Sequence, residues 1–347
     1  MSAPYFLDTY VNETPREWQN FVDSSPLCNI FQTRYWAKAM REAGLQSLLI
    51  VARDEEGDIK GGILGIHQKD SFLKLHIVPA LQAWGGPLAY KITDKQLIET
   101  LIRHLDEKAK KLGTLQSFIR SFAPLDDVLV DRLNYIVEKD RLPCTVIIDL
   151  DQSTEQIWKQ LQERGRRGIR KATKKGVTVE EGTTFEDLIA YYQIAQKTCE
   201  RLKIPPPSFR VIQSLWRTFS HDENIKLFLA KYETKVIAGV FVVRWQDKMW
   251  GWHGASLAEY WDLNANLLIH WRIMEWGAKN QLKTYDLMGI PCQKNSNHPK
   301  YGLYLFKTQF GGEIVRHGEY VKLYSPFKSI LLSRVLTPVY RQFCRLG

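Results

Sequence analysis

The chain has 347 residues, of which 44% are hydrophobic, and 48 lysines and arginines against 38 acidic residues give a formal charge of +10. This length can bury one large core or two ordinary ones, and the absence of an apolar run of 18 residues argues against a membrane-spanning helix. The first residues, MSAPYFLDTY, do not resemble a secretory signal. The positive charge favours an acidic partner, such as nucleic acid, a nucleotide-linked substrate or an anionic membrane face; the alternative is ordinary solubility charge.

The cysteines are five in number, widely separated and without a CxxC pair. This pattern is typical of a reduced, cytoplasmic protein. We therefore expect neither a disulfide framework nor a zinc site. The five positions are Cys28, Cys144, Cys199, Cys292 and Cys344.

The first half of the chain predicts two short helices, a set of strands, one long helix and a closing strand. The short helices begin at Thr14 and Thr33. The strands, read as an antiparallel meander, are SLLIVARD, IKGGILGI and SFLKLHIV. Apolar spacing predicts a helix from Asp94 to Leu112, and LQSFIR follows as a strand.

The same order recurs in the second half. The strands KLFLAKYE, VIAGVFVVRW and MWGWHGAS form a second meander, residues 266–279 predict a helix, and TYDLMGI closes the unit. This is an internal duplication of about a hundred residues, too long for a solenoid repeat. Locally paired strands followed by a helix that crosses to another strand indicate an α+β unit of the N-acetyltransferase (GNAT) type.

The predicted fold is therefore α+β, with two tandem acetyltransferase-like domains facing a cleft. We place the first domain at residues 1–144 and the second at 145–322. A C-terminal helix, within residues 323–347, is expected to complete the first domain. Ligand pockets tend to lie in such clefts.

A strongly basic segment, residues 153–175, lies between the two halves. Such a density of charge on helical turns costs self-repulsion unless an anion lies opposite. We expect contact with phosphates, and the alternative is a solvated basic face. The residues selected for phosphate or tRNA contact are Arg166, Arg167, Arg170 and Lys171.

Four stretches of the sequence resemble the Fem family (FemABX), the aminoacyl-tRNA-dependent transferases that add amino acids to the peptidoglycan stem peptide. They span nearly the whole chain. They are NIFQTRYWAKAMREAG, IWKQLQERGRRGIRKATKKGVTVE, the TCERLKI region, and WHGAS through YDLMGIP to GLYLFKTQFGGE. The last is the most specific.

The resemblance implies two acetyltransferase-like domains and the transfer of an amino acid from aminoacyl-tRNA to an amine of a nucleotide- or lipid-linked muramyl peptide. It also implies roles in cell wall biogenesis and cell shape. We expect a cytoplasmic monomer without a cofactor. Residues 326–346 read as a basic amphipathic helix, and peripheral contact with the inner membrane face is an alternative role for it.

Two residues near the end of the chain are expected to carry the chemistry. Phe306 and Lys307 match the phenylalanine and lysine of the family's Phe-Lys pair. When an amine attacks an ester carbonyl, a fixed cation can stabilise the tetrahedral oxyanion. Lys307 can equally hold the terminal phosphate of the tRNA. Without the family resemblance, a surface lysine is the simpler reading.

Further residues are expected to bind the acceptor. Lys38 matches a family lysine that contacts the nucleotide-diphosphate part of the acceptor, and a helix-surface lysine is the alternative. Arg201 and Arg210 are both candidates for a family arginine that shares this role, because Pro205–Pro207 blurs the match.

Other site assignments rest on residue type and position. Asp286, expected at the end of a strand, could accept the proton of the attacking amine, but such an aspartate more often caps a turn. Trp252 and Tyr260 could line the peptide channel, although alternating aromatic residues more often form core. His253 has no second ligand at metal spacing, so no metal is expected.

Two rival functions explain parts of the sequence. An acyl-CoA-dependent N-acyltransferase, acting on a sugar- or nucleotide-linked amine, places a diphosphate on glycine-rich backbone at a helix N-terminus. The matching stretch, residues 261–266, contains no glycine and one acid, which disfavours that reading. An RNA-binding module explains the charge but not the duplication.

Overall fold

The computed structural model describes residues 5–68, 79–91, 93–137, 142–219, 223–325 and 327. The chain divides into two compact units, one formed by residues 1–141 with 317–347 and the other by residues 142–316. The sequence prediction placed the corresponding boundaries after residues 144 and 322. The later boundary differs because strand β15, at residues 318–323, belongs to the sheet of the first unit.

The first unit contains one eight-stranded sheet. Its strands are β1 (Phe6–Val11), β2 (Gln46–Arg53), β3 (Ile59–Gln68), β4 (Ala80–Trp84), β5 (Leu88–Ala89), β6 (Gln116–Ser121), β7 (Ile136–Val137) and β15 (Gly318–Leu323). The path through the sheet is β1-β2-β3-β4-β6-β15-β7, and β5 pairs with β3. Pairing is antiparallel except between β4 and β6, which are parallel, among the described residues.

Helices cover both faces of this sheet. They are α1 (Arg16–Ser24), η1 (Ile30–Gln32), α2 (Arg34–Glu42), α3 (Lys95–Lys111) and α4 (Asp127–Arg132). The side chains of β2 alternate between two cores, as the period of a strand requires. Leu48 and Ile50 pack in the core that contains α3, whereas Leu49 and Val51 pack with α1 and α2.

The second unit contains a seven-stranded sheet in the order β14-β8-β13-β12-β11-β10-β9. Its strands are β8 (Cys144–Asp149), β9 (Val177–Gly182), β10 (Ile225–Tyr232), β11 (Lys235–Trp245), β12 (Lys248–Ser256), β13 (Thr284–Ile290) and β14 (Glu313–Arg316). Its helices are α5 (Thr154–Gln160), α6 (Glu163–Lys174), α7 (Phe185–Leu202), α8 (Phe209–Phe219), η2 (Ala258–Leu263), α9 (Ala265–Lys279) and α10 (Tyr301–Thr308).

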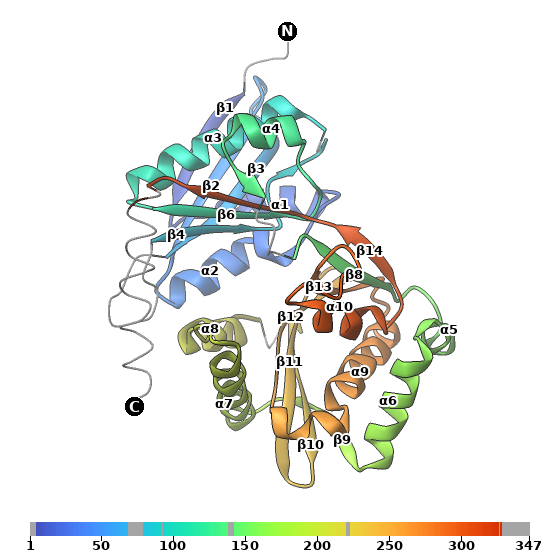
Figure 1. Ribbon diagram of the computed structural model, residues 1–347. Helices are drawn as coiled ribbons and strands as arrows, with labels where there is room; N and C mark the ends of the chain where they lie inside the picture. Colours follow the sequence, from blue (N-terminus) through green and yellow to red (C-terminus); the bar gives the residue numbers. More distant parts are fainter. Residues whose placement is uncertain are drawn as a thin grey trace. The chain divides into compact units, whose positions relative to one another are not determined.

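Two helical layers enclose the second sheet. In Figure 1, α7 and α8 lie on one face of it, and α5, α6 and α9 lie on the other. Strand β11 supplies side chains to both layers: Val240 and Val242 join the core beneath α9, while the ring centroid of Phe241 lies 4.8 Å from that of Tyr191 on α7. Helix α7 begins with a capping box formed by Thr184 and Asp187, which satisfies N–H groups of its first turn.

The two units repeat one arrangement. In the first, β2, β3 and β4 are antiparallel neighbours, and α3 leads to β6, which pairs in parallel with β4. In the second, β10, β11 and β12 are antiparallel neighbours, and α9 leads to β13, which pairs in parallel with β12. The predicted α+β fold, with two tandem acetyltransferase-like units, is confirmed.

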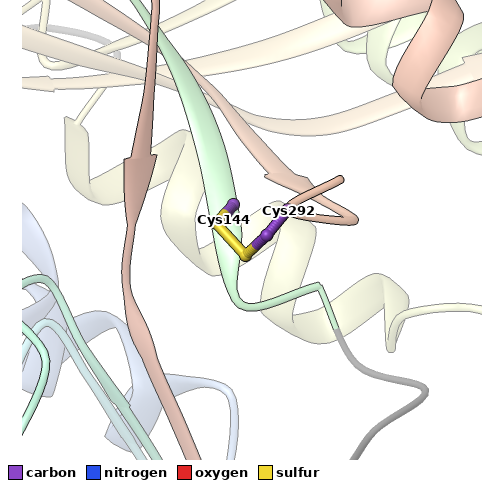
Figure 2. Close-up of a disulfide and its surroundings, with 2 residues drawn as sticks. All are labelled: Cys144 and Cys292. Atoms are coloured by element: carbon purple, nitrogen blue, oxygen red, sulfur yellow. A yellow bond between two sulfur atoms is a disulfide. The ribbon is translucent and has the colours of Figure 1, made fainter. Parts of the chain in front are cut away.

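A disulfide joins Cys144 to Cys292 inside the second unit (Figure 2). The expectation that the chain contains no disulfide is therefore wrong. The two cysteines are 148 residues apart in sequence, but β8 pairs with β13 so that Cys144 lies opposite Ile290. The chain just beyond Ile290 thus brings Cys292 to Cys144, with 5.0 Å between their Cα atoms. Cys28 and Cys199 are buried and do not form a disulfide.

Two expectations fall largely on residues outside the described part of the chain: the strand SFLKLHIV and the C-terminal helix within residues 323–347. Of the described helices, none is both long enough and apolar enough to span a bilayer.

Candidate active site

A cavity opens in the second unit where two parallel strands part. Strands β12 and β13 pair at three positions only, the last of which joins Trp250 to Asp286. Beyond this point β12 continues beside β11, and β13 bulges away from β8. The cavity has a volume of about 720 Å³, a typical size for a small-molecule site. Its walls include Gly251, Ser256 and Leu287 from these strands, the start of α9, and α10.

The charged side chains that line the cavity are all positive. Three cationic side chains line it, those of Arg164, Arg201 and Lys307. Among the described residues that form its walls, none carries a carboxylate. The first turn of α9, at Ala265 and Asn266, also faces the cavity, and the N–H groups of a first turn lack partners inside their helix. The cavity is therefore suited to a ligand with negative charge.

Lys307 is fixed on α10 by the backbone of β13. Its ammonium group donates hydrogen bonds of 3.1 Å to the carbonyl oxygens of Met288 and Gly289. These carbonyls lie at the break in register between β13 and β8, where Met288 has a φ of +63°. The lysine is half-buried, so its charge is held at a defined point of the cavity wall.

The Gly-Gly turn that follows α10 requires two left-handed residues. Gly311 and Gly312 have φ values of +78° and +80°. A Cβ atom on Gly312 would lie 2.5 Å from the carbonyl oxygen of Ile147. Only glycine combines this conformation with such a close approach, and the turn directs the chain from α10 into β14.

Asp286 does not lie where the sequence predicted it. It is inside β13 rather than at its end, is 5% exposed, and is not among the residues that line the cavity. Its carboxylate accepts hydrogen bonds from the hydroxyl of Thr145 and, at 2.6 Å, from the backbone N–H of Met288. These bonds stabilise the bulge that supports Lys307. The role of Asp286 as a proton acceptor stays a prediction.

Phe306 and His270 form the wall beside Lys307. The ring centroids of Phe306 and His270 are 5.6 Å apart, and the centroid of Phe310 lies 5.3 Å from that of the same imidazole. The Nδ1 atom of His270 is 2.8 Å from the hydroxyl of Tyr285. Burial, with a smaller contribution from the charge of Lys307, lowers the pKa of His270 to about 3.

Arg201 reaches the cavity from α7. Its guanidinium donates to the carbonyl oxygen of Ser256 at 3.0 Å and lies 4.6 Å from the ring of Trp261. Tyr260, from η2, also lines the cavity, and its hydroxyl accepts a 3.2 Å hydrogen bond from Lys235. The structure therefore brings together four predicted site residues in one cavity: Arg201, Tyr260, Phe306 and Lys307.

Three further predicted residues lie outside this cavity. Lys38 is on α2 of the first unit, exposed, and 3.8 Å from Glu42. Arg210 is exposed on α8. Trp252 is on β12, where its ring meets those of Phe241 and His253.

The predicted basic residues of α6 divide between two tasks. Arg166 donates to Glu163 and to the carbonyl oxygens of Lys159 and Leu161, which makes it a structural residue of the helix start. Arg167, Arg170 and Lys171 are exposed. Hydrogen bonding to Arg166, together with the charges of Arg170 and Arg167, lowers the pKa of Glu163.

A second, smaller hollow lies beside α6. It has a volume of about 410 Å³ and is lined in part by Trp158 and Trp271, whose ring centroids are 4.8 Å apart. The cations Arg170, Lys174 and Arg272 also line it. Aromatic and cationic side chains therefore lie side by side here, with the guanidinium of Arg170 5.4 Å from the ring centroid of Trp158.

The sequence prediction missed two residues that line the cavity, Arg164 and His270, and the hydrogen-bond partner of His270, Tyr285. Arg164 belongs to the basic run but was not selected, and its position lines the cavity because of the helical phase of α6. His270 and Tyr285 are 15 residues apart, on a helix and a strand that only the fold brings together. The available signal was a histidine within the apolar run at the start of α9, followed by a tyrosine in the closing strand.

Comparisons with known proteins agree with this architecture. Residues 159–299 match the family model of the acetyltransferase (GNAT) domain. The chain is 22% identical, over an alignment of 384 residues, to a lipid II:glycine glycyltransferase of Staphylococcus haemolyticus, covering 87% of this chain and 89% of that protein.

Two solved structures share the fold. The crystal structure of FemX matches with a TM-score of 0.70 at 17% identity, covering 94% of this chain and all of that one. A tandem GNAT protein from the clavulanic acid biosynthesis pathway matches with a TM-score of 0.60 at 10% identity, covering 92% of this chain and 99% of that one.

The parted strands, the cavity between them and the duplicated units define a tandem acetyltransferase-fold enzyme. Within this class, the chain is similar in sequence to a lipid II:glycine glycyltransferase and in fold to FemX. The non-enzymatic alternative, an RNA-binding module, is not retained.

Proposed function

We propose that this enzyme transfers an amino acid from aminoacyl-tRNA to an amine of a peptidoglycan precursor, forming a peptide bond. The observation that carries the proposal is the cavity in which Phe306 and Lys307 lie, with three cationic side chains and no carboxylate among its described walls. The relative from Staphylococcus haemolyticus, named for glycine transfer to lipid II, supports the same chemistry.

The reaction needs stabilisation of one developing negative charge. The acceptor amine attacks the ester carbonyl, a C–N bond forms, and the carbonyl oxygen becomes an oxyanion. The ester C–O bond then breaks, and the proton lost by the amine goes, through solvent, to the ribose hydroxyl that leaves. The ammonium of Lys307, held by two carbonyl oxygens at 3.1 Å, is the group that meets the oxyanion.

Other cations suit the phosphates of the donor. Arg164 and Arg201, at the cavity, are positioned for the terminal phosphates of a tRNA. The exposed Arg167, Arg170 and Lys171 on α6 provide a sequence-independent surface for its backbone. Lys38 and Arg210 remain proposed contacts to the diphosphate of the acceptor.

The relative's name favours a lipid-linked acceptor over a soluble nucleotide-linked one. We propose that the enzyme acts as a cytoplasmic monomer that touches the inner membrane face to reach such a substrate. Binding to vesicles that contain the lipid-linked precursor, compared with vesicles of the same charge without it, tests this placement.

A second candidate, an acyl-CoA-dependent N-acyltransferase acting on a sugar- or nucleotide-linked amine, has one observation in its favour. The first turn of α9 faces the cavity beside Arg164 and Arg201, and such a helix N-terminus can hold a diphosphate. Calorimetry with acetyl-CoA tests this candidate directly. Saturable binding at micromolar concentration would favour it.

The proposed function is tested by incubating the enzyme with mixed charged tRNAs and a muramyl peptide, either nucleotide-linked or lipid-linked. We expect the mass of one acceptor to rise by one amino-acid residue, and the increment names the donor. Uncharged tRNA is the control. No increase with any charged tRNA, together with acetyl-CoA binding, would replace the proposal with the acyl-CoA candidate.

A further inference from the structure

His270 is a buried histidine on the wall of the cavity. It is 8% exposed, lies on α9, and lines the cavity together with Phe306 and Lys307. The rings of Phe306 and Phe310 pack against its imidazole, and the hydroxyl of Tyr285 bonds to its Nδ1 atom. The ring therefore has a fixed orientation, with Nδ1 engaged inside the protein.

The partner of Nδ1 determines which nitrogen carries the proton. Tyr285 is fully buried, and among the described residues its hydroxyl has no other hydrogen-bond partner than His270. A buried hydroxyl that fails to donate loses about 1–3 kcal/mol, so its proton points to the one available acceptor, Nδ1. The proton of the neutral imidazole then resides on Nε2.

The imidazole of His270 remains neutral because its protonated form is disfavoured in this buried position near Lys307. Desolvation lowers the pKa of His270 to about 3, and the nearby charge of Lys307 acts in the same direction. Within the described part of the chain, no group accepts a hydrogen bond from Nε2–H. A histidine that is more than nine-tenths buried and lines the cavity thus has one ring donor without a partner among the described residues.

We infer that His270 donates its Nε2–H to the oxyanion beside Lys307, as a second catalytic residue, and that Tyr285 positions it by fixing the tautomer. This inference rests on the proposed aminoacyl transfer. The ligand atom is the carbonyl oxygen of the aminoacyl ester, which gains charge as the amine attacks. A fixed neutral donor adds stabilisation without repelling the ammonium of Lys307.

The alternative role, a general base, requires a lone pair on the nitrogen that faces the ligand. In the Nε2–H tautomer that lone pair is on Nδ1, which is already bonded to Tyr285. His270 therefore acts as a donor, and the proton of the amine leaves by another route.

Two substitutions of His270 distinguish the role of Nδ1 from that of Nε2. His270→Asn keeps a polar atom near the position of Nδ1, beside Tyr285, and removes the donor at the cavity. His270→Gln places an amide N–H near the position of Nε2. We expect His270→Asn to lower kcat about 100-fold with little change in KM, and His270→Gln to restore most of that loss. Tyr285→Phe removes the hydroxyl that keeps the imidazole proton on Nε2, and it should lower kcat by about tenfold.

Equal activity of wild type and His270→Asn would overturn the inference, as would equal loss in the Asn and Gln variants when both fold. Folding is checked by thermal unfolding of each variant. These outcomes leave the proposed function intact, because they require an active wild type. If the wild type transfers no amino acid, the proposed function fails, and the catalytic role of His270 fails with it.

A readout without substrate tests the tautomer by itself. Nitrogen-15 NMR of the histidine side chains, with the His270 signal assigned by its absence in His270→Gln, should show that this imidazole is neutral at pH 5, with its proton on Nε2. Its signal should change in Tyr285→Phe. A protonated ring at pH 5, or a proton on Nδ1, would contradict the assignment whatever the substrate proves to be.

Discussion

Two histidines of the second unit are neutral for the same physical reason. His253 and His270 each bond to a tyrosine hydroxyl, that of Tyr191 and that of Tyr285 respectively. Desolvation lowers the pKa of His253 to about 4 and is the main cause that lowers the pKa of His270 to about 3. Both tyrosines are fully buried, and burial raises their pKa values well above 10. Each pair is therefore uncharged at neutral pH.

Acid should destabilise the second unit because of these histidines. Their pKa in the unfolded chain is about 6.5, so the unfolded state binds more protons between that pH and the lower pKa values of the folded state. The free energy of unfolding should be level above pH 6.5 and fall as pH drops toward about 4 for His253 and about 3 for His270. The slope approaches ~1.4 kcal/mol per pH unit for each histidine.

Urea unfolding of wild type and His253→Gln at pH 7, 6 and 5 measures this effect. The variant should lose part of the slope below pH 6.5, whatever its stability at pH 7. Parallel curves for the two proteins would show that His253 is already protonated, or not desolvated, in the folded state.

Helix α6 shows that a basic run can also be a packing element. The helix lies against α9, and a Cβ atom on Gly168 would lie 2.3 Å from Cδ1 of Leu267, a residue that lines the cavity (Figure 1). A Cβ atom on Gly165 would likewise lie 2.9 Å from the carbonyl oxygen of Gln309. The sequence indicated only the charge of this segment, because the residues that these glycines approach, Leu267 and Gln309, lie far along the chain.

Gly168→Ala should therefore displace Leu267 and narrow the cavity. We expect the free energy of unfolding to fall by about 1–3 kcal/mol, as for an overpacked core, with a lower kcat/KM for transfer. Gly302→Ala, also helical but with open space at its Cβ, is the control for stability and should not destabilise the protein. Wild-type stability and activity in Gly168→Ala would contradict the close packing of α6 on α9.

The disulfide joins the first residue of β8 to the segment that follows β13. It constrains the unfolded chain over a separation of 148 residues, so Cys292→Ser should lower the free energy of unfolding by about 2–4 kcal/mol. The comparison is made in oxidising buffer, and in reducing buffer wild type and variant should become alike. Denatured, unreduced wild type should show two fewer reactive thiols than the reduced protein. Equal thiol counts would contradict the bond.

At the scale of the whole molecule, the duplicated fold was predictable from sequence. The helices α3 and α9 and the strands β6 and β13 were each predicted close to their observed bounds. The patterns that identify them are local: apolar residues repeat with the period of a helix, and short apolar runs follow. The recurrence of this order then indicated two units.

The parts that the sequence did not predict depend on contacts between distant residues. The pairing of β15 with β6 joins residues about 200 positions apart, and the Cys144–Cys292 bond and the His270–Tyr285 pair also need the folded sheet. Asp286 was expected at the end of a strand because nothing local marks the bulge at Met288. Lys307 was selected through its family resemblance, and its anchoring on β13 could not be read from the chain.

The central claim is that the charge of Lys307 stabilises the oxyanion during aminoacyl transfer. The most direct test is the single-turnover rate of transfer from charged tRNA by Lys307→Met, with Lys279→Met, an exposed lysine of α9, as the matched control. We expect the first variant to be about 100- to 1000-fold slower than wild type, and the second to match wild type. A folded Lys307→Met enzyme that transfers at the wild-type rate would contradict the claim.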